Sequence, residues 1–163
     1  MSSDSVFDVI IIVEDDHGLN RLITKKLNMQ GYKTLSAFNG TEAISLVKKH
    51  DNILFLTDYV LPDMDADQLI AKIKEIQENI PFIITTGQGD ERLAVDMMKK
   101  GALDYITKGS GFLEILPEVI KQAENKVFTE RLLDQTEKAL KASERNFRQI
   151  IKKSGNGIFV RQK

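Results

Sequence analysis

Hydrophobic and polar residues alternate along this chain in blocks that predict strands and helices in turn. Residues 6–13 are almost entirely β-branched and apolar, which is typical of a strand buried on both faces of a sheet. Residues 17–30 then carry apolar side chains at helical spacing, and Gly31 is a suitable helix stop. These apolar residues are Leu19, Leu22, Ile23 and Leu27. The first block therefore predicts a strand followed by a helix.

The same pattern recurs four more times before residue 110. Further strands are predicted at residues 34–38, 53–57, 82–86 and 104–107, and further helices at residues 41–50, 66–77 and 91–100. Such alternation with short connections predicts an α/β fold, a doubly wound five-stranded parallel sheet with helices on both faces. In open sheets of this kind, functional sites form beyond the carboxyl ends of the strands.

The last third of the chain predicts one long helix whose apolar seam changes phase. No glycine occurs between Gly111 and Gly155, and Pro117 is expected in the first helical turn. The first seam comprises Leu116, Ile120, Ala123 and Val127. The second seam has heptad spacing and comprises Leu133, Thr136, Leu140, Ser143, Phe147 and Ile150. We expect the first seam to pack on the sheet and the second to pair with another copy of the chain as a parallel homodimer.

Composition narrows the class of protein. The chain has 163 residues, 42% of them hydrophobic, which suits one core and an appendage. Its 23 basic and 24 acidic residues form no chain-wide basic field, so we expect no nucleic acid partner. The absence of cysteine excludes disulfides and thiol catalysis. The longest apolar run, residues 9–13, is too short for a membrane span, and we expect a cytoplasmic protein with no membrane partner.

Charged and hydroxyl side chains follow four of the predicted strands. Residues 14–16 are all acidic and follow the first strand, and Asp58 follows the third. Carboxylates that meet in one crevice repel each other unless a cation lies among them, and Mg²⁺ suits such oxygen ligands. Thr86 and Lys108, at the ends of the last two strands, add a hydroxyl and an ammonium group. This set fits transfer of a phosphoryl group to a carboxylate, which requires charge neutralisation and alignment.

Each of these residues also has a plainer interpretation when it is taken alone. Acidic residues after a strand often cap the following helix, and Asp58 could be a turn residue before Pro62. Lys108 could be a solvated charge. Their joint occurrence at four strand ends favours a site. His17 and His50 have no neighbours at metal-ligand spacing, so we interpret both as structural or surface residues.

Four sequence motifs resemble the receiver domain of two-component response regulators. They are IIIVEDD at residues 10–16, TDYVLPDMD at 57–65, ITTG at 84–87 and GALDYITK at 101–108. The resemblance covers residues 6–125 and implies a flavodoxin-like sheet with strand order 2-1-3-4-5. It also implies that the partner is a sensor histidine kinase or a phosphotransfer protein that carries a phosphohistidine.

The resemblance implies a Mg²⁺ site. Asp15 matches the direct carboxylate ligand, and Glu14 matches the acid that acts through water. Asp58 and the backbone carbonyl of Val60 match the remaining protein ligands. Asp16 falls outside the acidic pair.

The resemblance also implies roles in phosphoryl transfer and switching. Asp58 matches the phosphoryl acceptor, and Lys108 matches its ion-pair partner. Thr86 matches the hydroxyl that holds the phosphoryl group, and Tyr105 matches the aromatic that changes rotamer on activation. These roles imply self-catalysed aspartyl phosphorylation and slow dephosphorylation rather than a conventional enzyme.

The chain departs from the family pattern in two loops. Gly109 replaces the usual proline after the lysine, which makes a cis peptide improbable and the loop more mobile. Gly87 replaces the commoner alanine. Val60 and Gln88, two positions beyond Asp58 and Thr86, are expected to influence the lifetime of the phosphoryl group.

The end of the chain resembles the opening of a PAS sensor domain. Residues 140–151 and 154–160 carry this resemblance, although a simple amphipathic extension remains an alternative. We therefore expect a receiver domain at residues 6–125, a coiled-coil-like linker helix at 126–150 and a truncated PAS-like start at 151–163.

Three further interpretations of the function stay open. The chain could be a receiver-fold interaction module that is not phosphorylated, or a fragment of a hybrid sensor histidine kinase. It could also be a flavodoxin-like FMN protein. No Ser/Thr-rich phosphate loop follows the first strand, and the acids there disfavour a phosphate that lacks a metal.

Overall fold

The fold is a five-stranded parallel sheet, seen in a computed structural model that describes residues 5–87 and 89–161. The strands are β1 (Val9–Val13), β2 (Thr34–Ala37), β3 (Ile53–Asp58), β4 (Phe82–Thr86) and β5 (Asp104–Thr107). Their order is β2-β1-β3-β4-β5, and every neighbouring pair is parallel. The predicted fold class and strand order are confirmed.

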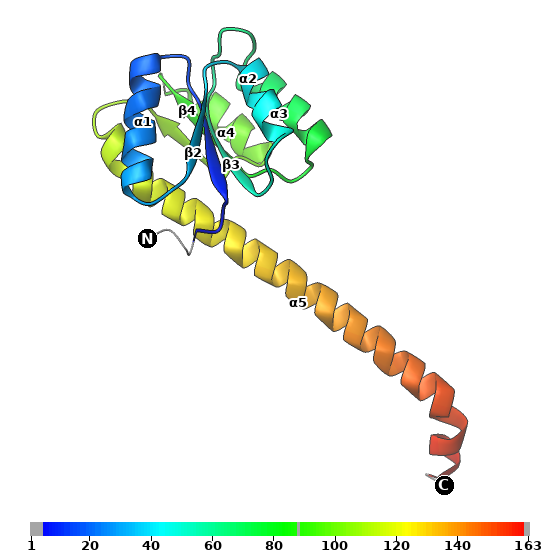
Figure 1. The fold of residues 1–163 in the computed structure, drawn as a ribbon. Helices are drawn as coiled ribbons and strands as arrows, with labels where there is room; N and C mark the ends of the chain where they lie inside the picture. Colours follow the sequence, from blue (N-terminus) through cyan, green and yellow to red (C-terminus); the bar gives the residue numbers. More distant parts are fainter. Residues whose placement is uncertain (1–4, 88, 162–163) are drawn as a thin grey trace. The chain divides into compact units, whose positions relative to one another are not determined.

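Within the described residues, five helices connect and follow the strands. They are α1 (His17–Met29), α2 (Gly40–Val47), α3 (Ala66–Ile76), α4 (Glu91–Lys99) and α5 (Phe112–Arg161). Figure 1 shows α1 on one face of the sheet and α2 and α3 on the other. The doubly wound arrangement places the connections after β1, β3, β4 and β5 at one edge of the sheet, where sites form in such folds.

The core explains why β1 and the first four residues of β3 are continuous apolar runs. Every residue of β1 and β3 is buried. Val9, Ile11 and Val13 belong to the core cluster that includes buried residues of α2, α3 and α4. Ile10 and Ile12 point to the opposite face, because successive side chains of a strand alternate. Both faces of the central strands are therefore apolar.

The first strand begins three residues later than predicted. The β1 to β3 ladder starts at Val9, opposite Ile53. Asn52, which precedes β3, has a φ of 53° and donates a side-chain hydrogen bond to the carbonyl of Val6. Phe7 is buried although it lies outside the strand. The apolar run at residues 6–13 therefore indicates which residues are buried, whereas the turn at Asn52 determines where β1 begins to pair with β3.

The position predicted for Pro117 is wrong by one turn. Helix α5 begins at Phe112, so Pro117 is its sixth residue rather than part of the first turn. Gly111, with a φ of 82°, makes the turn into the helix. Because proline has no N–H, the carbonyl of Leu113 lacks its usual helical donor. The first seam is nevertheless buried, as predicted, at Leu116, Ile120, Ala123 and Val127.

The chain divides into two compact units, Met1–Lys126 and Val127–Lys163. In the second unit, helix α5 continues to Arg161, and the large apolar residues of the second seam are exposed. Part of the predicted PAS-like start lies outside the described residues, namely residues 162–163 and the side chains of residues 154–161. Within the described part of the chain, none of the helices is apolar over a length that would cross a membrane.

Candidate functional site

Three consecutive acids follow β1, and the structure gives them different surroundings. Glu14 is buried, whereas Asp15 and Asp16 are exposed. The Asp16 carboxylate accepts a hydrogen bond from the N–H of Leu19 at 2.9 Å and caps α1. The N–H of Asp16 donates to Glu14 Oε1 at 3.0 Å. Helix capping therefore accounts for Asp16, and Glu14 and Asp15 remain for the site.

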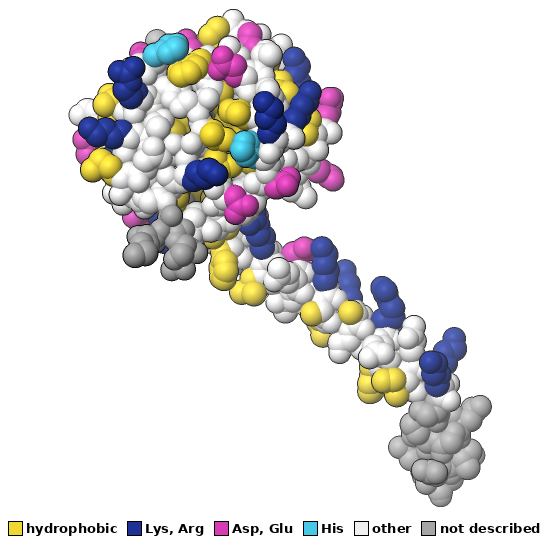
Figure 2. Space-filling view, in the orientation of Figure 1, with side chains coloured by type: hydrophobic (Ala, Val, Ile, Leu, Met, Phe, Trp, Pro, Cys, Tyr) yellow, Lys and Arg dark blue, Asp and Glu magenta, His cyan; other side chains and the backbone are white. Residues whose placement is uncertain are grey.

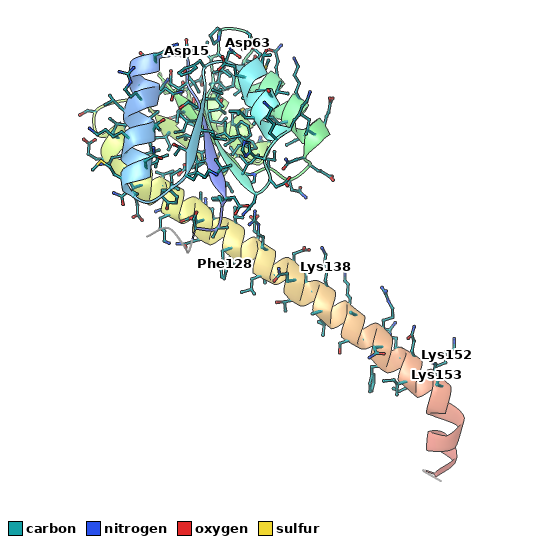
Figure 3. All side chains as sticks on the ribbon, in the orientation of Figure 1. Asp15, Asp63, Phe128, Lys138, Lys152 and Lys153 are labelled. Carbon is teal, nitrogen blue, oxygen red and sulfur yellow. The ribbon has the colours of Figure 1, made fainter. Side chains whose placement is uncertain are left out.

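Asp58 is the last residue of β3 and is 8% exposed. The loop after it is held by its main chain, because the N–H of Tyr59 donates to the carbonyl of Thr85 at 2.9 Å. The carbonyl of Tyr59 accepts from the N–H of Ala66, the first residue of α3, at 2.8 Å. An antiparallel bridge between Val60 and Asp65 closes the loop. Figure 3 shows Asp15 and Asp63, from the loops after β1 and β3, at the same end of the sheet.

Lys108 joins two of the carboxylates. Its Nζ donates to Glu14 Oε2 at 2.7 Å and to Asp58 Oδ2 at 2.8 Å. The three side chains are only 14%, 3% and 11% exposed for Lys108, Glu14 and Asp58. The N–H of Lys108 donates to the carbonyl of Thr86 at 2.7 Å, which fixes the start of this side chain beside the end of β4. Lys108 is therefore a largely buried charge between two acids, not a solvated one.

The electrostatics of the cluster favour further positive charge. Carboxylate oxygens of Glu14, Asp15 and Asp58 lie within 4.8 Å of one another. Burial raises the pKa of Glu14, and the charge of Asp58 adds to this, although Lys108 and the Asp16 N–H act in the opposite direction. Burial alone would lower the pKa of Lys108, but its contacts with Asp58 and Glu14 outweigh burial and raise that pKa. The cluster thus holds three acids around one ammonium group.

Asp58 opens onto a surface cavity of about 550 Å³. Its lining residues are Asp15, Asp58, Tyr59, Val60, Thr86, Gly87, Asp90, Leu93 and Lys108. The structure therefore brings together residues from four strand ends, as the sequence predicts. The side chain of Val60 is 68% exposed, and that of Thr86 is largely buried.

Tyr105 lies on β5, opposite Ile84 in the strand register. Its ring packs against the core, and within the described part of the chain its buried hydroxyl has no hydrogen-bond partner. A buried, unpaired hydroxyl costs about 1–3 kcal/mol.

The two glycines that depart from the family pattern have open surroundings. A Cβ added to Gly87 or Gly109 would meet no atom within 4 Å. All peptide bonds of the described residues are trans, in agreement with the prediction for Gly109. Gln88 lies outside the described residues.

The two histidines have structural surroundings in the described part of the chain. The ring of His17 stacks on Phe38 with centroids 4.0 Å apart and planes at 7°. The carbonyl of His50 accepts a hydrogen bond from Gln77 Nε2. Neither residue belongs to the acidic cluster.

The sequence reasoning missed two buried polar residues. Asn20 takes an inward position on α1, whereas Leu22 of the predicted apolar face is 52% exposed. Glu124 on α5 is buried and accepts hydrogen bonds from Ser5 Oγ, the Val6 N–H and Tyr32 Oη. Its donors lie 92 or more residues away in the chain, so no local pattern signals them. Asn20 gives a weak signal, since it fits the helical spacing of Ile23 and Leu27.

Comparison with known proteins agrees with the fold. Residues 10–120 match the response regulator receiver domain family. Sporulation initiation phosphotransferase F of Bacillus subtilis is 35% identical over 112 residues, which cover 69% of this chain and 90% of that protein. Hybrid signal transduction histidine kinase D of Dictyostelium discoideum is 28% identical over 114 residues, but the chain covers only 7% of its length.

A solved structure is similar over the same part of the chain. The beryllofluoride-activated NtrC4 receiver domain dimer has a TM-score of 0.68 and 27% identity, with 74% of this chain and 98% of that one covered. The matched residues contain all five strands apart from Val9, and they include every strand end that surrounds the cavity. The chain therefore belongs to the response regulator receiver domain family and is a phosphoryl-accepting module of two-component signal transduction.

Proposed function

We propose that Asp58 accepts a phosphoryl group from a phosphohistidine of a sensor histidine kinase or phosphotransfer protein. The observation that carries this proposal is the position of Asp58. Its carboxylate lies beside two other carboxylates and the Lys108 ammonium group, and it opens onto a cavity that an incoming phosphohistidine side chain can enter. The name of the similar Bacillus subtilis protein, a phosphotransferase, supports the same chemistry.

The acidic cluster fits a Mg²⁺ ion. Three carboxylates face one ammonium group, and that ammonium group bonds Glu14 and Asp58 but not Asp15 in any described contact. A hard divalent cation with oxygen ligands balances the remaining charge. We assign Asp15, Asp58 and the Val60 carbonyl as its protein ligands, with Glu14 acting through water. When bound, Mg²⁺ neutralises phosphoryl oxygens and orients them for in-line transfer.

The side chains of the site then have distinct tasks in the transfer. An oxygen of Asp58 forms the new bond to phosphorus while the bond from phosphorus to the imidazole nitrogen breaks and leaves its electron pair on that nitrogen. Lys108 holds a positive charge at Asp58, in a partly buried site where charge interactions are stronger than in water. Thr86, on the cavity wall, places a hydroxyl beside the acceptor for a phosphoryl oxygen.

The decisive experiment is intact-mass spectrometry after incubation with acetyl phosphate and Mg²⁺. We expect one added phosphoryl group in the wild type and none in Asp58→Asn, which preserves the shape of the side chain. Asp63→Asn, at an exposed acid five residues away, serves as the matched control and should be modified like the wild type. Modification of Asp58→Asn, or full modification in excess EDTA, would contradict the proposal. An unmodified wild type would favour the interaction module instead.

We also propose that Thr86 and Tyr105 transmit the phosphorylation state. The buried and unpaired hydroxyl of Tyr105 favours a move to a rotamer in which it reaches water or a partner, once a shift of Thr86 makes room. Beryllofluoride, which mimics the phosphoryl group, should therefore change the environment of Tyr105 in the wild type. In Thr86→Ala this change should be smaller although beryllofluoride still binds, as NMR of the aromatic ring can show. Equal changes in both proteins would exclude Thr86 from the switch.

We propose further that the second unit is a signalling helix that pairs in parallel with a second copy. Leu133, Leu140 and Phe147 recur every seven residues and are each about 60% exposed. Figure 2 shows hydrophobic side chains along one side of this part of α5 and Lys and Arg side chains along the other. Figure 3 shows Lys138 and Lys152 on a common side of the helix. The helix is thus amphipathic with an uncovered apolar seam.

Charges beside the seam favour the parallel orientation. Acids flank it at seven-residue intervals, at Glu130, Glu137 and Glu144. An antiparallel pair brings these same flanks together and sets acid against acid, whereas a parallel pair does not. The solved receiver domain dimer shows that a similar domain assembles in pairs. A PAS-like domain after residue 151 would then receive the signal from two parallel helices.

The strength of this dimer follows from the size of the seam. Each large apolar side chain contributes roughly 1.5–3 kcal/mol on burial, and association costs about 4 kcal/mol or more. With Thr136 and Ser143 in the seam, we expect a weak or moderate dimer. In sedimentation, Leu140→Glu should be monomeric at concentrations where the wild type is dimeric. Gln135→Glu, an exposed residue off the seam, is the control and should resemble the wild type. A monomeric wild type at high micromolar concentration would exclude the pairing.

A further inference from the structure

We propose that Asn20 is a positioning residue of the metal site, which holds the main chain of Glu14 and so sets the direction of the acidic pair. This inference rests on the Mg²⁺ site proposed above. Asn20 lies on α1, six residues beyond Glu14, and is 2% exposed. It touches no phosphoryl group and ligates no metal in this proposal. Its contribution is to the geometry of the loop that carries Glu14 and Asp15.

The amide of Asn20 joins three elements of the fold. Its Nδ2 donates to the carbonyl of Glu14 at 3.1 Å and to the carbonyl of Ala37, at the end of β2, at 3.4 Å. Its Oδ1 accepts from Ser36 Oγ at 2.7 Å and from Thr24 Oγ1 at 3.3 Å. The carbonyls of Glu14 and Ala37 can only accept, so they identify the atom that contacts them as the nitrogen and the other as the oxygen. Every polar atom of the buried amide is therefore engaged.

The bond to Glu14 continues the sheet beyond its last strand pair. The β1 to β2 register ends at Val13 and Ala37, and the N–H of Glu14 donates to the Ala37 carbonyl at 3.0 Å. The Asn20 amide donates a hydrogen bond to the carbonyl of Glu14, and it donates a second one to the Ala37 carbonyl that already accepts from Glu14. Glu14 is thus held on its N–H side by β2 and on its carbonyl side by α1.

This carbonyl belongs to the peptide that leads into Asp15. Because a peptide group is planar, fixing the direction of the Glu14 carbonyl fixes the plane from which the Asp15 chain departs. The side chain of Glu14 is fixed separately, by the Asp16 N–H and by Lys108. Asn20 is therefore the side chain that orients the exposed acid Asp15, which no described hydrogen bond to another side chain holds in place.

Asparagine suits this position for a chemical reason. The site requires two donors on one side of the group and an acceptor on the other, which a carboxylate or a hydrocarbon of the same size does not provide. Asn20→Leu removes the donors without adding charge. Asn20→Ala removes them and also leaves space. Both variants leave every carboxylate of the acidic cluster in the chain.

The test is the affinity of the full chain for Mg²⁺, measured by calorimetry and repeated with Mn²⁺ by electron paramagnetic resonance. Loss of a partner that orients metal ligands typically weakens metal binding by about 10-fold to 100-fold. We expect Asn20→Leu and Asn20→Ala to fall in this range, in the absence of any phosphoryl donor. Asn28→Ala is the matched control, since Asn28 lies on the same helix, is exposed and accepts one hydrogen bond from Thr34. It should bind Mg²⁺ like the wild type.

A second control distinguishes positioning of the metal ligands from a general loss of stability. Val9→Ala destabilises β1, the strand that leads to Glu14, at the end far from the site, where Val9 is buried opposite Ile53. It should lower the unfolding temperature but leave Mg²⁺ affinity unchanged. If the Asn20 variants do not fold, Ser36→Ala, which removes one bond to the Asn20 amide, should still weaken Mg²⁺ binding more than Asn28→Ala does.

The outcomes distinguish this inference from the function on which it rests. Folded Asn20 variants, or Ser36→Ala, with wild-type Mg²⁺ affinity would overturn the positioning role while phosphorylation at Asp58 stood. A wild type that binds no Mg²⁺ would overturn both the metal site and the role of Asn20. Phosphorylation by acetyl phosphate in the wild type, and its loss in Asp58→Asn, would still test the acceptor independently.

Discussion

Replacing Lys108 by methionine tests the electrostatic account of the site, because methionine keeps an apolar stem and removes the ammonium group. That group lies 2.7 Å from Glu14 and 2.8 Å from Asp58, and all three side chains are at most 14% exposed. Removing one partner of a buried ion pair costs about 3–5 kcal/mol, since it leaves an uncompensated charge. The cavity admits water at Asp58, so we expect about 3 kcal/mol, the lower end of that range.

Mg²⁺ should restore much of the folding stability that Lys108→Met loses. At the proposed site, Mg²⁺ would share two carboxylates with Lys108 in the wild type, whereas in Lys108→Met it would meet the three acids alone. We therefore expect tighter Mg²⁺ binding in the variant. A ligand at 100 times its dissociation constant stabilises the folded state by about 2.7 kcal/mol, and each tenfold gain in affinity adds about 1.4 kcal/mol. The increment that Mg²⁺ adds to stability should thus be larger in Lys108→Met than in the wild type.

The assay is urea unfolding followed by circular dichroism, once with EDTA and once with Mg²⁺. Lys100→Met is the matched control, because Lys100 also bridges two acids, at 2.6 Å from Asp67 and 3.0 Å from Asp96. That side chain is 45% exposed, and exposed ion pairs contribute little. Lys100→Met should therefore lose much less folding stability than Lys108→Met, and Mg²⁺ should stabilise it as much as it stabilises the wild type. The account is refuted if Lys108→Met loses no more stability than Lys100→Met, or if Mg²⁺ stabilises it no more than the wild type.

Three shorter predictions concern residues that do not line the cavity. Burial alone would raise the pKa of Asp63, but hydrogen bonds from Thr41 and Gly40 outweigh burial. They lower the pKa of Asp63 below its unfolded value of 3.8. The stability that Asp63 contributes is therefore present above pH 3.8 and lost as the pH falls further, and urea unfolding of Asp63→Asn should lack this acid-dependent part. Gly40→Ala places a Cβ against the Met64 side chain and should cost about 1–3 kcal/mol, with recovery in the double variant that also carries Met64→Ala. Glu124→Gln replaces an acceptor of three hydrogen bonds by a group with one acceptor oxygen and should lower the free energy of unfolding by about 1–3 kcal/mol.

Much of the fold could be predicted from the sequence because each strand and helix of the sheet domain carries its own local signal. The runs that became β1 and β3 are buried at every position, and an unbroken apolar run is the pattern of such strands. The ends of strands and helices were predicted less accurately, because their positions depend on contacts with distant residues. The turn at Asn52, which delays strand pairing to Val9, has no signal within residues 6–13.

The residues around the cavity could be predicted for a topological reason. The carboxyl ends of parallel strands share one edge, so polar residues directly after them must lie near each other. Asp58 and Lys108, 50 residues apart in the chain, form a 2.8 Å contact. The supporting residues could not be found in this way. Asn20 and Glu124 are polar residues on buried helix faces, where the pattern of apolar residues favours Leu22 and other hydrocarbons over them.

The two apolar seams of helix α5 differ in burial although their sequence patterns are similar. Leu116 and Ile120 are fully buried, whereas Leu133 and Leu140 are each 59% exposed, although all four are large aliphatic residues spaced regularly on one helix. A periodic apolar seam shows that a helix face is suited to burial, but it does not identify the surface that covers it. The first seam is buried within the chain itself. For the second seam, the pairing proposed above would bury these side chains, and the energy of that burial would vary with protein concentration.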